Sequence, residues 1–255
     1  MLEAIIIGLV EGLTEFLPIS STGHMLIANA FLQKEYSNAF YVLIQIGPIA
    51  ACTLVFWRDI IKLKLDYAIK LGAAFLITCA GGFIAKQLGL KLPETILPVA
   101  FAVLIGAFII FAVELSTKKR HLNTNITWAI VIAVALGQII AAVFPGASRS
   151  GMAIMGALIV GLARPDAVRF AFLVGIPTMF AAGGYELLKE IQAGKTADLL
   201  LPESIVAYIV ATISAWLSVV WLLKFVQSKN FIPFAWYRVV LGVGLLTLFA
   251  FNVIS

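Results

Sequence analysis

The sequence predicts an all-α polytopic membrane protein, with six spanning helices and two re-entrant helix–loop–helix segments related by an inverted-topology repeat. Hydrophobic residues make up 62% of the 255 residues and charged residues 12%, whereas soluble domains carry about 25% charged residues. Mean hydropathy is +1.05, and apolar segments recur from end to end. Prolines interrupt two of these segments. We therefore expect a single integral membrane domain over residues 1–255.

Six uninterrupted apolar segments predict the spanning helices, because a span needs about 17–25 residues. The segments lie near residues 40–57, 71–85, 95–115, 170–187, 205–223 and 234–254. The segment at 71–85 is shorter than a full span, so its ends are the least well defined.

Two further apolar blocks, about 2–32 and 126–162, are broken near their middles by Pro18 and Pro145. Proline, glycine and serine there end one helix and start another, so each block is either a re-entrant hairpin or two short spans. Non-helical backbone cannot face lipid, so the two breaks predict an internal polar chamber. The half-helices that follow the breaks aim their N-terminal N–H groups into it, which favours an anion.

Positive charge sets the orientation of such a chain, because cytoplasmic loops carry an excess of lysine and arginine. With the basic cluster at 118–120 placed in the cytoplasm, eleven basic residues fall on that side and five on the outer side. The eleven are Arg58, Lys62, Lys64, Lys70, Lys118, Lys119, Arg120, Arg164, Arg169, Lys224 and Lys229, and the five are Lys34, Lys86, Lys91, Lys189 and Lys195. This topology places both termini outside.

The two halves of the chain, approximately 1–117 and 124–255, resemble each other. Glu11 precedes Pro18 by the same interval that Gln138 precedes Pro145, which sets Ser20-Ser21 opposite Ala147-Ser148. The first broken block enters the membrane from outside and the second from inside. We therefore predict an inverted-topology repeat whose broken segments face each other near the midplane.

Glu11 and Glu15 are four residues apart, so they share one face of a helix. Two carboxylates close together in an apolar region cannot both stay freely ionised; one is protonated, or a cation lies between them. The pair is therefore an acid/base pair or part of a divalent-metal site. The alternative is a helix-end pair exposed to water.

Residues 20–24, Ser-Ser-Thr-Gly-His, supply three hydroxyls, a glycine and an imidazole. One hydroxyl is explained as a helix N-cap, but a cap does not explain His24 at membrane depth. His24 beside Ser21 indicates a nucleophile with its base, or a histidine that is itself the nucleophile or proton donor. Ser20 and Thr22 are candidate substrate-binding groups.

Arg149 lies between Ser148 and Ser150, shortly after Gly146. A guanidinium matches phosphate oxygens in a bidentate fork, and neighbouring N–H groups can form a cradle around an anion. These four residues are therefore candidates for binding phosphate. The alternative is a structural ion pair between Arg149 and Glu11 or Glu15.

Residues 11–24 and 145–150 resemble the signature motifs of the bacterial undecaprenyl-diphosphate phosphatase family, of the bacitracin-resistance type. The family pattern of Glu or Gln, three residues, then Glu matches residues 11–15. Its Leu-Pro-(Ile/Val)-Ser-Ser-Thr-Gly-His stretch matches 17–24, and its Pro-Gly-x-Ser-Arg-Ser matches 145–150. The resemblance covers essentially the whole chain. One departure is Ala153, where the family often has a threonine.

This resemblance implies hydrolysis of undecaprenyl diphosphate to the monophosphate and phosphate, which recycles the lipid carrier of cell-wall synthesis and confers bacitracin resistance. It also implies dependence on a divalent cation, Mg²⁺ or Ca²⁺, and a site open to the outer face of the bacterial cytoplasmic membrane. The expected partners are the polyprenyl diphosphate lipid and the bilayer. A net charge of +5 is too small to indicate nucleic acid, and the sequence leaves a homodimer open.

The expected catalytic groups are Glu11, Glu15, Ser21, His24 and Arg149. In the favoured mechanism Ser21 is the nucleophile and His24 its base, Arg149 stabilises the transferring phosphoryl group, and the two glutamates hold the cation or orient His24 and water. His24 as direct nucleophile and an activated water stay open. A competing interpretation is a polyprenyl-phosphate transporter, because inverted repeats and broken helices also describe transporters.

Overall fold

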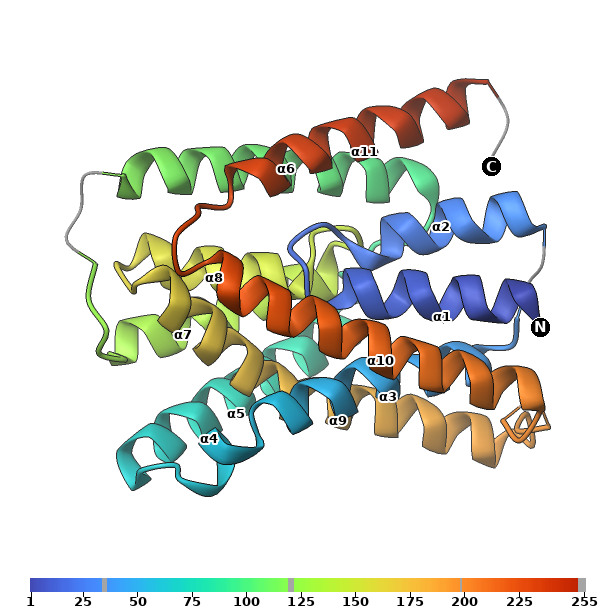
Figure 1. Ribbon diagram of the computed structural model, residues 1–255, viewed down its shortest axis with the longest axis horizontal. Coiled ribbons are helices and arrows are strands. Elements are labelled where there is room, and N and C mark those ends of the chain that lie inside the picture. The colour runs from blue at the N-terminus through green and yellow to red at the C-terminus, as the bar shows by residue number, and fades with distance from the viewer. Residues whose placement is uncertain (34–35, 119–121, 198, 252–255) are drawn as a thin grey trace.

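The computed structural model describes residues 1–33, 36–118, 122–197 and 199–251, and over these residues the chain forms eleven helices and no strand (Figure 1). They are α1 (Leu2–Glu15), α2 (Ser21–Leu32), α3 (Asn38–Val55), α4 (Trp57–Ile61), α5 (Leu65–Gln87), α6 (Ile96–Thr117), α7 (Trp128–Val143), α8 (Arg149–Ile159), α9 (Arg164–Gln192), α10 (Pro202–Phe225) and α11 (Ile232–Ala250).

Six of these helices, α3, α5, α6, α9, α10 and α11, are long and apolar enough to cross a membrane. The prediction of an all-α protein with six spanning helices is confirmed, but several helices are longer than their apolar segments, α5 and α9 by the most. The segment 71–85 becomes α5, and 170–187 becomes the 29-residue α9. The extra turns carry charged residues such as Lys70 and Lys189, whose long stems let a helix continue past its apolar stretch. Lys34, Lys119 and Arg120 of the charge count lie outside the described residues.

The two broken blocks have turns with the same backbone conformation. Ser20 and Ser148 are the N-caps of α2 and α8, with φ of 76° and 70°. Each serine hydroxyl accepts a hydrogen bond, 3.2 Å long, from the N–H of the glycine three residues on, Gly23 or Gly151. Positive φ is uncommon for residues other than glycine, so the shared conformation is a specific feature of both turns.

This correspondence corrects the predicted alignment of the halves by one residue. The turns separate α1 from α2 and α7 from α8 by equal lengths, so Ser20 is equivalent to Ser148 and not to Ala147. The prolines are not equivalent: Pro18 is opposite Gly146 because each lies two residues before its capping serine. The re-entrant course and the inverted topology stay predictions.

The first helix of each broken block packs against a spanning helix from the other half, α1 on α10 and α7 on α5. Helices α6 and α11 pack along each other at one edge of the bundle, and the start of α1 and the end of α11 lie at the same end of the molecule (Figure 1). The turn between α1 and α2 and the turn between α7 and α8 contact each other in the middle of the bundle (Figure 1).

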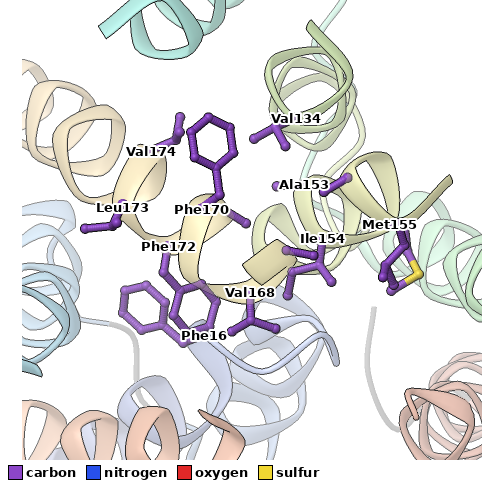
Figure 2. Packing of buried hydrophobic residues seen from close by; sticks show 14 of the residues in the cluster. Phe16, Val134, Ala153, Ile154, Met155, Val168, Phe170, Phe172, Leu173 and Val174 are labelled. Atoms are coloured by element: carbon purple, nitrogen blue, oxygen red, sulfur yellow. The ribbon is translucent and has the colours of Figure 1, made fainter. Parts of the chain in front are cut away.

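An apolar core anchors the first turn to the second half of the chain. Phe16, which follows α1 directly, packs its ring against Phe172 of α9 with the centroids 4.9 Å apart. Figure 2 shows this pair beside Ile154 of α8 and the other buried side chains of α9. This apolar packing holds the polar C-terminal end of α1 next to the polar N-terminal end of α8.

Candidate active site

A pocket where α1, α7, α8 and α9 meet is lined by residues of both signature motifs. Glu15 and Phe16 line it from the first string, and Arg149 and Ser150 line it from the second. The remaining lining residues are Gln138, Ala171, Phe172, Gly175 and Met179. A carboxylate and a guanidinium from opposite halves of the chain thus line one pocket whose walls are otherwise largely apolar.

Ser21 is hydrogen-bonded to Glu15 across the first turn. The Ser21 hydroxyl donates to Oε2 of Glu15 over 2.6 Å. The contact forms because Glu15 is the last residue of α1 and Ser21 the first residue of α2. A hydroxyl that donates a short bond to a carboxylate already directs its proton to a base, which is the arrangement of an activated nucleophile.

Glu11 lies one helical turn before Glu15 and is almost fully buried, with 2% of its surface exposed. Its Oε1 has no hydrogen-bond partner, and the charges of Glu15 and Arg149 act on its carboxyl group. A buried carboxylate oxygen without a partner is costly. The site therefore has an open position for a proton or a cation at Glu11.

Two carboxylates fit a divalent cation that takes its other ligands from water and phosphate. Among the described residues, no group of three or more His, Cys, Asp or Glu side chains is placed to hold a metal. Mg²⁺ is commonly bound by one or two carboxylates together with substrate phosphates. The unpartnered Oε1 of Glu11 and the carboxylate of Glu15 match that ligand set.

His24 is not the partner of Ser21, so the predicted Ser21–His24 pair is absent from this structure. Nδ1 of His24 lies 2.7 Å from the Ser20 carbonyl oxygen, and Nε2 lies 2.7 Å from the Tyr237 hydroxyl. A carbonyl only accepts, so Nδ1 carries a proton, and in the neutral ring Nε2 accepts from Tyr237. The imidazole is turned toward α11, where the two rings stack with centroids 5.6 Å apart.

The serines expected to bind substrate are engaged in turn contacts. Ser20 is buried and acts as the cap of α2, which is the role that the sequence allowed for one hydroxyl. The hydroxyls of Ser148 and Ser150 both donate hydrogen bonds to the carbonyl oxygen of Leu17, over 3.4 Å and 3.2 Å. These hydroxyls therefore hold the second turn against the first.

Thr22 and Gly146 differ in their surroundings. Thr22 is half-buried in the first turn of α2. Gly146 has φ of +93°, and a Cβ there would press against the backbone of Val99 in α6. A glycine is needed at this position for both reasons, and its carbonyl faces away into the protein, toward Arg238.

Arg149, half-buried at the start of α8, forms no ion pair in the part of the chain that the structure describes. The structural ion pair with Glu11 or Glu15, which the sequence left open, is therefore not formed. Arg149 nevertheless lines the same pocket as Glu15. Its guanidinium is available to bind an anion there.

Sequence reasoning missed two residues of α11. Tyr237 meets His24 across 213 residues of chain, a contact that no local pattern predicts. Arg238, which lies within the predicted span 234–254, is completely buried and donates to four backbone carbonyls. Its position inside an apolar segment was the available signal, because charged residues at membrane depth are functional candidates.

Comparison with known proteins finds relatives that match nearly the whole chain. The model of the family described as bacitracin resistance protein BacA matches residues 4–244. The chain is 46% identical to the undecaprenyl-diphosphatase of Rhizobium etli strain CFN 42, covering 100% of this chain and 99% of that protein. It is 43% identical to the undecaprenyl-diphosphatase of Xanthomonas campestris pv. campestris strain 8004, with 96% and 97% covered. For that of Xylella fastidiosa strain Temecula1 the identity is 41%, with 97% and 98% covered.

Proposed function

The chain belongs to the bacitracin resistance protein BacA family, and we propose that it is an undecaprenyl-diphosphatase. It hydrolyses undecaprenyl diphosphate to undecaprenyl monophosphate and phosphate, and so recycles the lipid carrier of cell-wall glycan synthesis. The observation that carries this proposal is the Glu15–Ser21 hydrogen bond on one turn, with Arg149 of the other turn lining the same pocket. Full-length relatives that carry the name undecaprenyl-diphosphatase support it.

Ser21 is the nucleophile of the proposed reaction. Its Oγ attacks the terminal phosphorus while the proton passes to Glu15, 2.6 Å away. The bond from that phosphorus to the bridging oxygen breaks, and undecaprenyl monophosphate leaves. Water then attacks the phosphoserine and the bond from phosphorus to Oγ of Ser21 breaks. Glu15 returns its proton to that Oγ, and phosphate leaves with the two protons of the water molecule. Glu15 takes the place that the sequence had given to His24, because His24 is bonded to Ser20 and Tyr237.

Arg149 binds the diphosphate and stabilises the charge that develops on the transferring phosphoryl group. A guanidinium without an internal carboxylate partner suits this role, since its fork is free for phosphate oxygens. The apolar walls of the pocket, including Phe172 and Met179, keep the site poor in water and strengthen that attraction. His24 is held between the Ser20 carbonyl and the Tyr237 hydroxyl at the start of the helix that carries Ser21.

Glu11 and Glu15 would hold a divalent cation, Mg²⁺ or Ca²⁺. Bound there, the cation supplies neutralisation of the phosphate charge. The protein's own contribution is the open carboxylate oxygen of Glu11, buried where no lysine or arginine bonds to it.

The protein is a multi-pass membrane protein with six candidate spans. We place it in the bacterial cytoplasmic membrane with both termini outside and the site opening to the outer face, because this orientation gives the cytoplasmic side the larger share of lysine and arginine. A homodimer is compatible with this placement. A lipid transporter is not favoured, because transport needs no Ser21–Glu15 pair and the relatives are named for hydrolysis.

The decisive test measures phosphate release from undecaprenyl diphosphate by the purified protein in detergent, with and without EDTA. We expect Arg149→Ala to lower kcat/KM by about a thousandfold or more, as loss of a charge-stabilising arginine does in phosphoryl transfer. Arg169→Ala is the matched control, because Arg169 is exposed and bonds to Asp59. EDTA should abolish release. Absence of release from folded wild-type protein across several divalent cations would contradict the proposal.

A further inference from the structure

Arg238 of α11 is a charged side chain with none of its surface exposed. Its Nε donates to the carbonyl of Val103 and its Nη2 to that of Ala102, each over 3.1 Å. Its guanidinium also donates to Pro18 over 3.3 Å and to Gly146 over 3.1 Å. No carboxylate is paired with it among the residues that the structure describes. A permanent charge held only by carbonyls is expensive at membrane depth, which makes a role beyond packing worth seeking.

The carbonyls of Pro18 and Gly146 occupy equivalent points of the two turns. Pro18 lies two residues before the capping Ser20, and Gly146 lies two residues before the capping Ser148. One guanidinium therefore donates hydrogen bonds to equivalent carbonyls of both turns. Arginine suits this task because its planar fork presents donors in fixed directions, whereas lysine concentrates its donors on one atom.

Helix α6 is shaped around this guanidinium. A Cβ built on Gly106 would fall on Nη2 and Cζ of Arg238, so glycine leaves the space that the side chain fills. The neighbouring carbonyls of Ala102 and Val103, in the same helix, accept the other two hydrogen bonds. The site of Arg238 is thus built from α6, α11 and both turns together.

We propose that Arg238 is a positioning residue for the reaction: it sets the distance between the turn that carries Glu15 and Ser21 and the turn that leads to Arg149. This inference rests on the proposed diphosphatase function. The bonds of Ser148 and Ser150 to the Leu17 carbonyl join the turns on one side. Arg238 joins them through Pro18 and Gly146, so the two sets of contacts together fix the relative position of nucleophile and phosphate-binding group.

Positioning has a kinetic signature that differs from that of a structural contact. A misplacement of about 1 Å between reacting groups costs about a hundredfold in rate. Binding of the lipid and of its phosphates depends on other groups and should persist. We therefore expect Arg238→Lys to lower kcat by about a hundredfold per folded molecule, with KM changed by less than about threefold, because the ammonium keeps the charge but cannot span both turns.

The matched control is Arg164→Lys. Arg164 also uses its guanidinium fork at a partly buried site, where it bonds to both carboxylate oxygens of Glu114. That contact ties α9 to α6 and involves neither turn. The control should lower the midpoint of thermal unfolding and leave kcat per folded molecule unchanged.

A second variant keeps Arg238 and displaces it. Gly106→Ala places a methyl group on the guanidinium and should lower kcat in the same direction with KM preserved. Gly244→Ala in α11, where a Cβ meets nothing within 4 Å, is its control and should behave as wild type.

The assay separates failure of this inference from failure of the proposed function. If wild-type protein releases no phosphate, the diphosphatase proposal itself fails. If wild type is active and both Arg238→Lys and Gly106→Ala retain its kcat, the positioning role is wrong. Loss of the folded state in both variants, or a loss of activity that only follows loss of fold, would assign Arg238 a purely structural role instead.

Discussion

The turns before α2 and α8 have the same backbone and opposite chemistry. Both are capped by a serine at positive φ that accepts a hydrogen bond from the glycine three residues on. Both also present one carbonyl to Arg238. The first turn carries a carboxylate and a hydroxyl, Glu15 and Ser21, while the second leads into a guanidinium, Arg149. A single way of breaking a helix in an apolar region therefore serves two tasks, acid/base chemistry and anion binding.

The difference between the turns lies in what their hydroxyls bond to. Ser21 donates to a carboxylate within its own turn. Ser148 and Ser150 instead contact the Leu17 carbonyl of the opposite turn. The first turn thus directs its hydroxyl proton to a base, and the second uses its hydroxyls to fix its own place. We infer that rate depends on the side chains of the first turn and on the backbone position of the second.

Ser21→Ala gives the largest effect expected within this comparison. Removal of the nucleophile should lower kcat by about a thousandfold or more, since only binding and charge stabilisation remain. Phosphate release in single-turnover conditions measures the loss. Ser150→Ala is the control from the second turn, and it should lower kcat far less. If Ser21→Ala kept near-normal turnover while His24→Ala abolished it, the serine mechanism would be wrong.

Glu11→Gln tests the assignment of the cation to the first turn. The amide removes one anionic ligand, so the concentration of Mg²⁺ or Ca²⁺ needed for half-maximal activity should rise by at least about tenfold. A titration of phosphate release with each cation after EDTA treatment measures this shift. An unchanged cation requirement in Glu11→Gln would place the metal elsewhere.

Tyr237→Phe tests the contribution of His24 with little change in shape. The variant removes the hydroxyl that lies 2.7 Å from Nε2 of His24 and keeps the stacked ring. A net hydrogen bond contributes about 0.5–1.5 kcal/mol, so kcat should fall by roughly two- to tenfold. Steady-state kinetics measure the change. A loss as large as that of Ser21→Ala would instead make Tyr237 part of the chemistry.

Local sequence signals predicted the parts of this site that local structure determines. Prolines among small residues marked both breaks, and a spacing of four residues placed Glu11 and Glu15 on one face of α1. The composition predicted the six spans. The equivalence of Ser20 with Ser148 was missed by one residue, because the prolines were aligned and the capping residues were not.

The rest of the site depends on tertiary contacts that leave no local pattern. His24 was assigned to Ser21 because they are near in sequence, yet its ring is held by Tyr237, far along the chain. Arg238 reaches Pro18 over 220 residues and Gly146 over 92. Backbone carbonyls carry no side-chain signature, so an arginine that binds only carbonyls cannot be matched to its partners from the sequence.

The smallest expected effect is on stability and comes from the two capping serines, Ser20 and Ser148. Ser20→Ala removes one cap and keeps the unfavourable φ, so the free energy of unfolding should fall by about 1 kcal/mol. Ser148→Ala should cost more, because the Ser148 hydroxyl also contacts Ser150 and the Leu17 carbonyl. Glycine at either position loses the cap but relieves the strain of positive φ, so each glycine variant should be more stable than the matching alanine variant, with Ser20→Gly near wild type. Thermal unfolding in detergent measures all four variants. Equal losses for the two alanine variants would mean that Ser148 acts only as a cap, and the second turn would then depend on Arg238 and Ser150 for its place against the first.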